Sequence, residues 1–139
     1  MRFAATLSSV ALLAAGCWWP GKPVVTRHCP NDDLPTLLRE ARIPADAEQI
    51  GARLTHLSSD CGLDMASRFR IVAKPASIVA LVQRMGMDRG GESGTPGSVG
   101  YSVQDRVQTT TFGSLVRDLK VDSTTTDGSQ SGVLQLFTT

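Results

Sequence analysis

A histidine with two nearby carboxylates is the first group in this chain that could do chemistry. His56 is followed by Asp60 and Asp64. A histidine that abstracts a proton while a carboxylate orients its ring is a common general base in hydrolases. A histidine on a strand more often has a structural role, and no complete catalytic set accompanies this one. We therefore assign no catalytic residue, and keep a hydrolase that uses His56 with a nearby Asp as an alternative.

Three arginines form a second candidate group. Arg53, Arg68 and Arg70 fall at alternating positions in two neighbouring segments that alternate apolar and polar residues. In a strand pair, side chains at alternating positions point to the same face. The three guanidinium groups are therefore expected to share an outer face that could bind anions or lipid headgroups, the simpler alternative being an ordinary solvated surface.

Several classes of site are disfavoured by composition. The chain has only two histidines and no Cys or His spacing typical of zinc sites, so no metal is expected. No phosphate loop, dinucleotide fingerprint or haem motif occurs, so no cofactor is expected. A formal net charge of +1 gives no basic face for nucleic acid. The stretch GESGTP (91–96) is similar to the nucleophile loop of trypsin-like serine proteases, but only over six residues, and the chain is too short for their two barrels.

The N-terminus has the organisation of a secretion signal. Arg2 supplies a basic start, residues 3–15 are uncharged and apolar or small, and LAAGC ends at Cys17. This apolar run is too short for a membrane-spanning helix, which needs about 20 residues. The ending resembles the lipobox of bacterial lipoproteins. The resemblance implies cleavage between Gly16 and Cys17, so that 1–16 is a signal peptide. It also implies a diacylglyceryl group on Cys17, which would anchor the protein to the extracytoplasmic face of the cell membrane. An ordinary cleaved signal peptide and an uncleaved anchor are the alternatives.

The lipobox changes how the cysteines are counted. Three cysteines are an odd number, which leaves one unpaired. If Cys17 carries lipid, Cys29 and Cys61 remain, and disulfides persist outside the cytoplasm. We therefore expect a Cys29–Cys61 bridge, the alternative being two free thiols. Residues 17–30 contain three prolines and are expected to form a lipid-anchored tether.

Residues 31–139 are expected to form a single domain. Apolar residues at helical spacing predict helices over 34–41 and 75–85. Alternation predicts strands over 48–57 and 65–73, paired as a hairpin. A flexible loop over 86–100 is expected from its six glycines. The remaining strand predictions are 99–104, an ambiguous segment at 106–112, and a second hairpin made of 114–122 and 133–139 around Asp127-Gly128. The predicted fold is α+β, a small antiparallel sheet of about four strands in two hairpins, with one or two helices on one face.

A second, looser resemblance concerns the domain itself. Residues 43–87, with Arg117–Asp122 and Val133–Phe137, resemble small lipoproteins of high-GC Gram-positive bacteria. That group implies a location and a fold but no activity. The sequence therefore favours a lipid-anchored, extracytoplasmic binding or structural protein of the cell envelope, without catalysis. Its expected partners are the membrane, through the lipid, and another envelope protein. The alternatives are the His56 hydrolase, acting on envelope material, and an accessory subunit of a membrane complex.

Overall fold

The computed structural model describes residues 33–61 and 64–138. Two α-helices, one short 3-10 helix and six strands follow one another in this part of the chain. In chain order they are α1 (Leu34–Glu40), β1 (Ala52–Cys61), β2 (Met65–Ala73), α2 (Pro75–Arg84), η2 (Met87–Arg89), β3 (Gly91–Ser93), β4 (Ser102–Gln108), β5 (Ser114–Thr124) and β6 (Gln130–Thr138).

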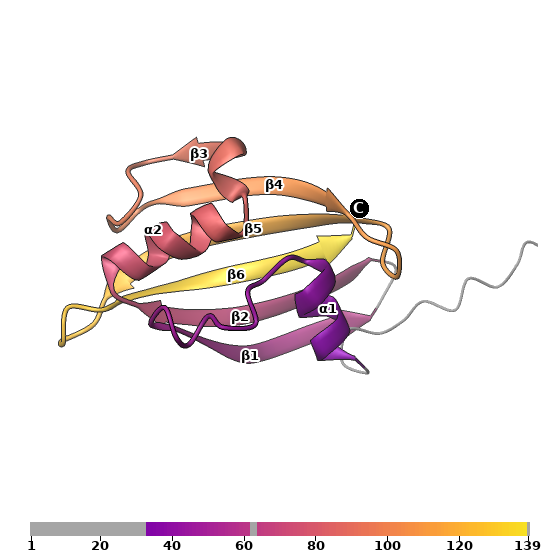
Figure 1. The fold of residues 1–139 in the computed structure, drawn as a ribbon, viewed down its shortest axis with the longest axis horizontal. Helices are drawn as coiled ribbons and strands as arrows, with labels where there is room; N and C mark the ends of the chain where they lie inside the picture. Colours follow the sequence, from indigo (N-terminus) through magenta and orange to yellow (C-terminus); the bar gives the residue numbers. More distant parts are fainter. Residues whose placement is uncertain (1–32, 62–63, 139) are drawn as a thin grey trace, which may run out of the picture.

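The strands form one antiparallel sheet in the order β1-β2-β6-β5-β4-β3 (Figure 1). The predicted α+β class and the two hairpins, β1–β2 and β5–β6, are confirmed. The predicted number of about four strands is wrong, because six strands make up the sheet. The C-terminal strand β6 lies between β2 and β5 and so joins the two hairpins edge to edge. Antiparallel pairing therefore runs without interruption across the whole sheet.

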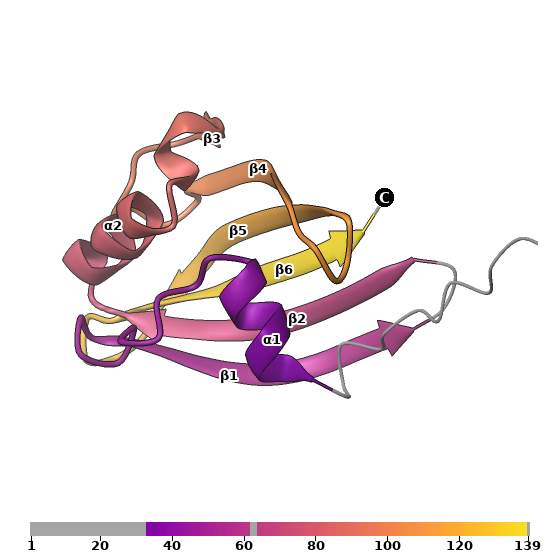
Figure 2. The ribbon, with the colours of Figure 1, turned by 45° about the vertical axis from the view of Figure 1, so that its right-hand side comes forward.

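Both helices cover the same face of the sheet (Figures 1 and 2). Leu37 of α1 and Leu81 of α2 are fully buried, and they belong to the same apolar core as Phe69, Ile71 and Leu134 from the sheet. We call this the helix face. The opposite face of the sheet is covered by no helix or strand of the described residues, and we call it the open face.

Local capping explains where the helices begin and end. The Asp33 side chain accepts a hydrogen bond from the Thr36 backbone N–H at 3.0 Å, which satisfies a free donor at the start of α1. Helix α2 begins at Pro75, whose missing N–H costs nothing in a first turn. Gly86 follows α2 with φ of +70°, a left-handed conformation that favours glycine and ends the helix.

The glycine-rich segment is more ordered than its composition predicts. Residues 86–100 contain η2 and β3, and β3 pairs with β4 at the edge of the sheet. Met87 and Tyr101 anchor the two ends of this excursion in the core, both with no exposed surface. The Tyr101 hydroxyl donates to the Glu92 carboxylate at 2.7 Å. The expectation that no regular element forms over 86–100 is therefore wrong.

Two strand boundaries also differ from the predictions. Strand β1 begins at Ala52 rather than at residue 48, because residues 46–51 form turns and the Ala52 N–H donates to the Ala47 carbonyl at 2.9 Å. Strand β4 replaces the two short segments expected before and after Asp105. Gly132 in β6 permits close contact with β5, since a Cβ there would lie 2.5 Å from the Lys120 carbonyl oxygen.

Candidate functional site

The three predicted arginines lie on the open face. Arg70 and Arg68 alternate with the buried Phe69 and Ile71 along β2, so their side chains point away from the helices. Arg53 stands opposite Val72, the next position on the same face. The structure therefore brings Arg53, Arg68 and Arg70 to one surface of the β1–β2 hairpin.

The three guanidinium groups differ in whether a carboxylate of the described residues pairs with them. Arg70 Nη1 lies 3.4 Å from an Asp122 carboxylate oxygen and donates to Ser131 Oγ at 3.1 Å. Lys120, on the same face, lies 3.6 Å from Asp118. Among the described residues, neither Arg53 nor Arg68 forms an ion pair. These two exposed side chains keep their full hydrogen-bonding capacity for a partner.

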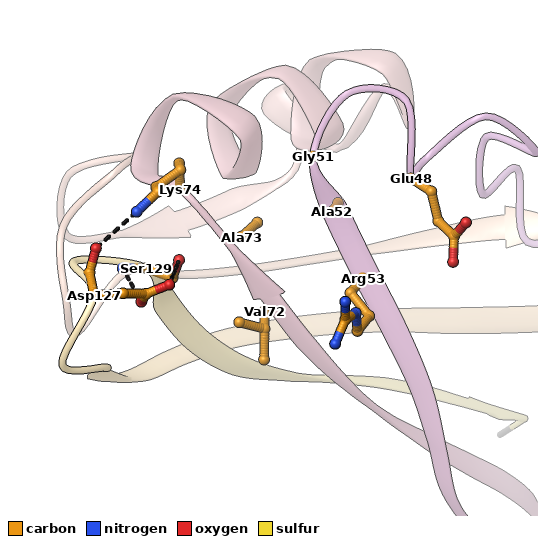
Figure 3. A pocket seen from close by; sticks show the side chains of 9 residues that line it. All are labelled: Glu48, Gly51, Ala52, Arg53, Val72, Ala73, Lys74, Asp127 and Ser129. Atoms are coloured by element: carbon orange, nitrogen blue, oxygen red, sulfur yellow. Dashed lines mark hydrogen bonds between the residues drawn. The ribbon is translucent and has the colours of Figure 1, made fainter.

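A groove lies at the end of the open face where β1 begins and β2 ends. Its volume is about 510 Å³, within the range typical of small-molecule sites. Three segments far apart in the sequence line it, namely 48–53, 72–74 and the β5–β6 turn (Figure 3). The lining residues are Glu48, Gly51, Ala52, Arg53, Val72, Ala73, Lys74, Asp127 and Ser129.

One wall of the groove is held by a hydrogen-bonded turn. The Asp127 carboxylate accepts from the Thr125 hydroxyl and from the Ser129 N–H at 3.0 Å. These hydrogen bonds, with a smaller contribution from the Lys74 ammonium, lower the pKa of Asp127 to about 2. Lys74 Nζ donates to the Asp127 carbonyl oxygen at 2.7 Å, which ties the end of β2 to the turn (Figure 3).

His56 lies elsewhere, on the helix face. Its Nε2 is 2.8 Å from Ser59 Oγ, which is 2.7 Å from Ser67 Oγ, and its ring packs on Phe69 with centroids 5.3 Å apart. A bulge after His56 keeps Ser59 on this face and sends Asp60 to the open face. The structure thus pairs His56 with serines rather than with the two nearby aspartates. Ser67 has no exposed surface, and none of these residues lines the groove.

The residues predicted for lipidation and cleavage, Gly16 and Cys17, lie outside the described residues, as does Cys29. Cys61 is the last residue of β1 and stands opposite Met65. The Cys29–Cys61 bridge therefore stays a prediction. Within residues 33–61 and 64–138, no helix is long and apolar enough to cross a membrane, and no cluster of side chains suits a metal ion.

The groove itself was missed by sequence reasoning. Lys74 had no assigned role, and Asp127 was recognised only as part of a turn. Nothing in the local pattern indicates that this turn lies beside the start of β1, because that proximity depends on β6 pairing with β2. Alternation, a local signal, was enough to group the three arginines.

Comparison with known proteins does not assign the chain. No protein-family model, no curated protein and no solved structure matches it.

Proposed function

We propose that this chain is a lipid-anchored, extracytoplasmic protein without catalytic activity, which binds an anionic component of the cell envelope through the open face of its sheet. The observation that carries the binding role is the gathering of Arg53, Arg68 and Arg70 on a face that no described element covers. The lipobox at Cys17 supports the location.

Charge complementarity favours an acidic partner. Arg68 is exposed and unpaired among the described residues, and the ion pair of Arg70 is itself exposed. Exposed ion pairs contribute little to folding, roughly 0–1 kcal/mol, so Arg70 can exchange Asp122 for an external anion at small cost. The neighbouring residues across the strand pair, Gln135 and Val133, add hydrogen bonding and apolar contact.

The proposal can be tested with a soluble polyanion as the probe. Binding of inorganic polyphosphate to the full chain in detergent would be measured at several salt concentrations for wild type and for the R68Q/R70Q variant. We expect the variant to bind about tenfold more weakly, since two charge-assisted contacts are removed. Wild-type affinity should fall as salt rises.

A matched variant separates the face from net charge. R39Q/R89Q removes the same two charges at exposed positions in α1 and η2 and should retain nearly wild-type affinity. Equal losses in both variants, or no binding by wild type, would contradict a specific anion-binding face.

A further inference from the structure

The groove differs in charge from the arginine-bearing face next to it. Two cationic side chains, Arg53 and Lys74, and two anionic ones, Glu48 and Asp127, line it. A polyanion attracted by Arg68 and Arg70 would meet two carboxylates here. The groove is therefore suited to a different kind of ligand from the rest of the open face.

Only two of these four charged groups have no hydrogen-bond partner among the described residues. Asp127 and Lys74 are engaged with the β5–β6 turn and with each other, as described above. Glu48 and Arg53 are both exposed, and neither side chain takes part in a hydrogen bond or ion pair among the described residues. The 48–53 wall thus presents one free carboxylate and one free guanidinium.

The rest of the groove provides space and an apolar surface. Ala52 and Ala73 turn their side chains into the core, so only their backbone can form the floor of the groove, and Val72 adds a half-buried apolar side chain. In Figure 3, Arg53 and Val72 lie between Glu48 on one side and the Lys74–Asp127 contact on the other. A ligand seated over Val72 would reach the charged groups from the middle of the groove.

We propose that this groove binds a zwitterionic small molecule or head group, which carries an ammonium group and a phosphate or carboxylate. The ammonium group meets the Glu48 carboxylate, and the anionic group meets the Arg53 guanidinium. A net neutral but dipolar ligand matches the two opposite charges, and neither charge is then left unpaired. This inference goes beyond the proposed function and holds whether or not the arginine-bearing face binds a polyanion.

The test compares ligands that differ by one charge. Glycerophosphoethanolamine and alanine are the net neutral zwitterions, glycerol 1-phosphate lacks the ammonium group, and ethanolamine lacks the anion. Each is titrated into the isotope-labelled full chain in detergent, and the backbone amides of Gly51, Val72 and Ser129 are followed by NMR. We expect at least one zwitterion to give saturable shifts at these amides, with about tenfold higher affinity than glycerol 1-phosphate or ethanolamine. The stronger of the two zwitterions identifies whether the anion is a phosphate or a carboxylate.

Substitutions then assign the two charges. E48Q and R53Q should each weaken zwitterion binding about tenfold, and E48Q should leave the affinity for glycerol 1-phosphate the same or higher. D88N, an exposed carboxylate change in η2, should leave all affinities unchanged. If glycerol 1-phosphate binds as tightly as the zwitterions, the groove is a simple anion site; if no compound shifts these amides, it is not a ligand site. Either result overturns the inference without affecting the R68Q/R70Q test.

Discussion

Arg117 shows how one charged residue is accommodated in the core. It is 1% exposed on the helix face of β5. Its Nε donates to Asp105 Oδ1 at 2.7 Å, one Nη donates to the other Asp105 oxygen, and the second Nη donates to the Ala41 carbonyl at 2.9 Å. These bonds satisfy the guanidinium and connect the end of α1 to β4 and β5. A buried charge is tolerated only when it is paired in this way.

The cost of breaking this pair is predictable. D105A leaves the Arg117 charge buried without its carboxylate, and we expect the free energy of unfolding to fall by about 3–5 kcal/mol. D118A removes the carboxylate beside Lys120, whose side chain is 68% exposed, and should cost no more than about 1 kcal/mol. Urea unfolding followed by circular dichroism gives both values. Similar losses in the two variants would show that Asp105 is not a specific partner of the buried arginine.

Among the elements, the β5–β6 hairpin depends on its turn. The Asp127 carboxylate accepts hydrogen bonds from Thr125 and Ser129. These bonds are strongest when the carboxylate is ionised. The same turn lines the groove, so the stability of the hairpin and the shape of the candidate site depend on one titrating group.

Stability below pH 4 should therefore depend on Asp127. Its pKa is lowered from 3.8 to about 2 in the folded protein. The resulting stabilisation is complete above the unfolded value and is lost as the pH falls from about 4 through 2. D127N, which cannot titrate, should show a smaller fall in the free energy of unfolding across this window than wild type. T125V, which removes one hydrogen bond to the carboxylate, should show an intermediate fall. Urea unfolding at several pH values provides the measurement, and three parallel pH profiles would rule out this role for Asp127.

The elements that could be predicted from the sequence are those with local signals. Helix α2 lies between Pro75 and Gly86, and the β5–β6 hairpin surrounds Asp127-Gly128, so neighbouring residues determine both. Strand β3 and helix η2 could not be found in this way, because their glycine-rich sequence has no hydrophobic periodicity and is held instead by the burial of Met87 and Tyr101 at its two ends. Met87 and Tyr101 are buried in the core on the helix face. That core forms only when the whole sheet has assembled, so a local pattern does not predict it.

One part of the candidate site could be predicted from local sequence and the other could not. Alternation around Phe69 and Ile71 was sufficient to place Arg68 and Arg70 on one face. The groove required the pairing of β2 with β6, with Ala73 opposite Gln130, which brings the turn at Asp127 beside Lys74. The sequence between β2 and β6 contains no local pattern that predicts their pairing. The groove could therefore not be predicted from the sequence.

At the scale of the whole molecule, the groove and Cys61 lie at opposite ends of β1. The strand begins at Ala52, which lines the groove, and ends nine residues later at Cys61. At about 3.3 Å per residue, these ends are roughly 30 Å apart. The first described helix, α1, begins near the Cys61 end of the sheet (Figure 2). A lipid on Cys17 and a bridge from Cys29 to Cys61 would therefore attach the domain by the end remote from the groove, which would leave the groove open to ligands away from the membrane.

Both covalent features of this arrangement can be measured by intact mass. Protein from the native membrane fraction should begin at Cys17 and carry a diacylglyceryl group, and the C17A variant should lack the lipid. Reduction should raise the mass of wild type by about two units, because a disulfide takes up two hydrogens, and C29S and C61S should each abolish that gain. The loop closed by the bridge would stabilise the domain by roughly 3–4 kcal/mol, so C61S should also unfold at a lower urea concentration.

An unlipidated wild-type chain would refute the anchor and return Cys17 to the set of possible disulfide partners. An unchanged mass on reduction would refute the bridge, and the groove would then have no fixed direction relative to the membrane.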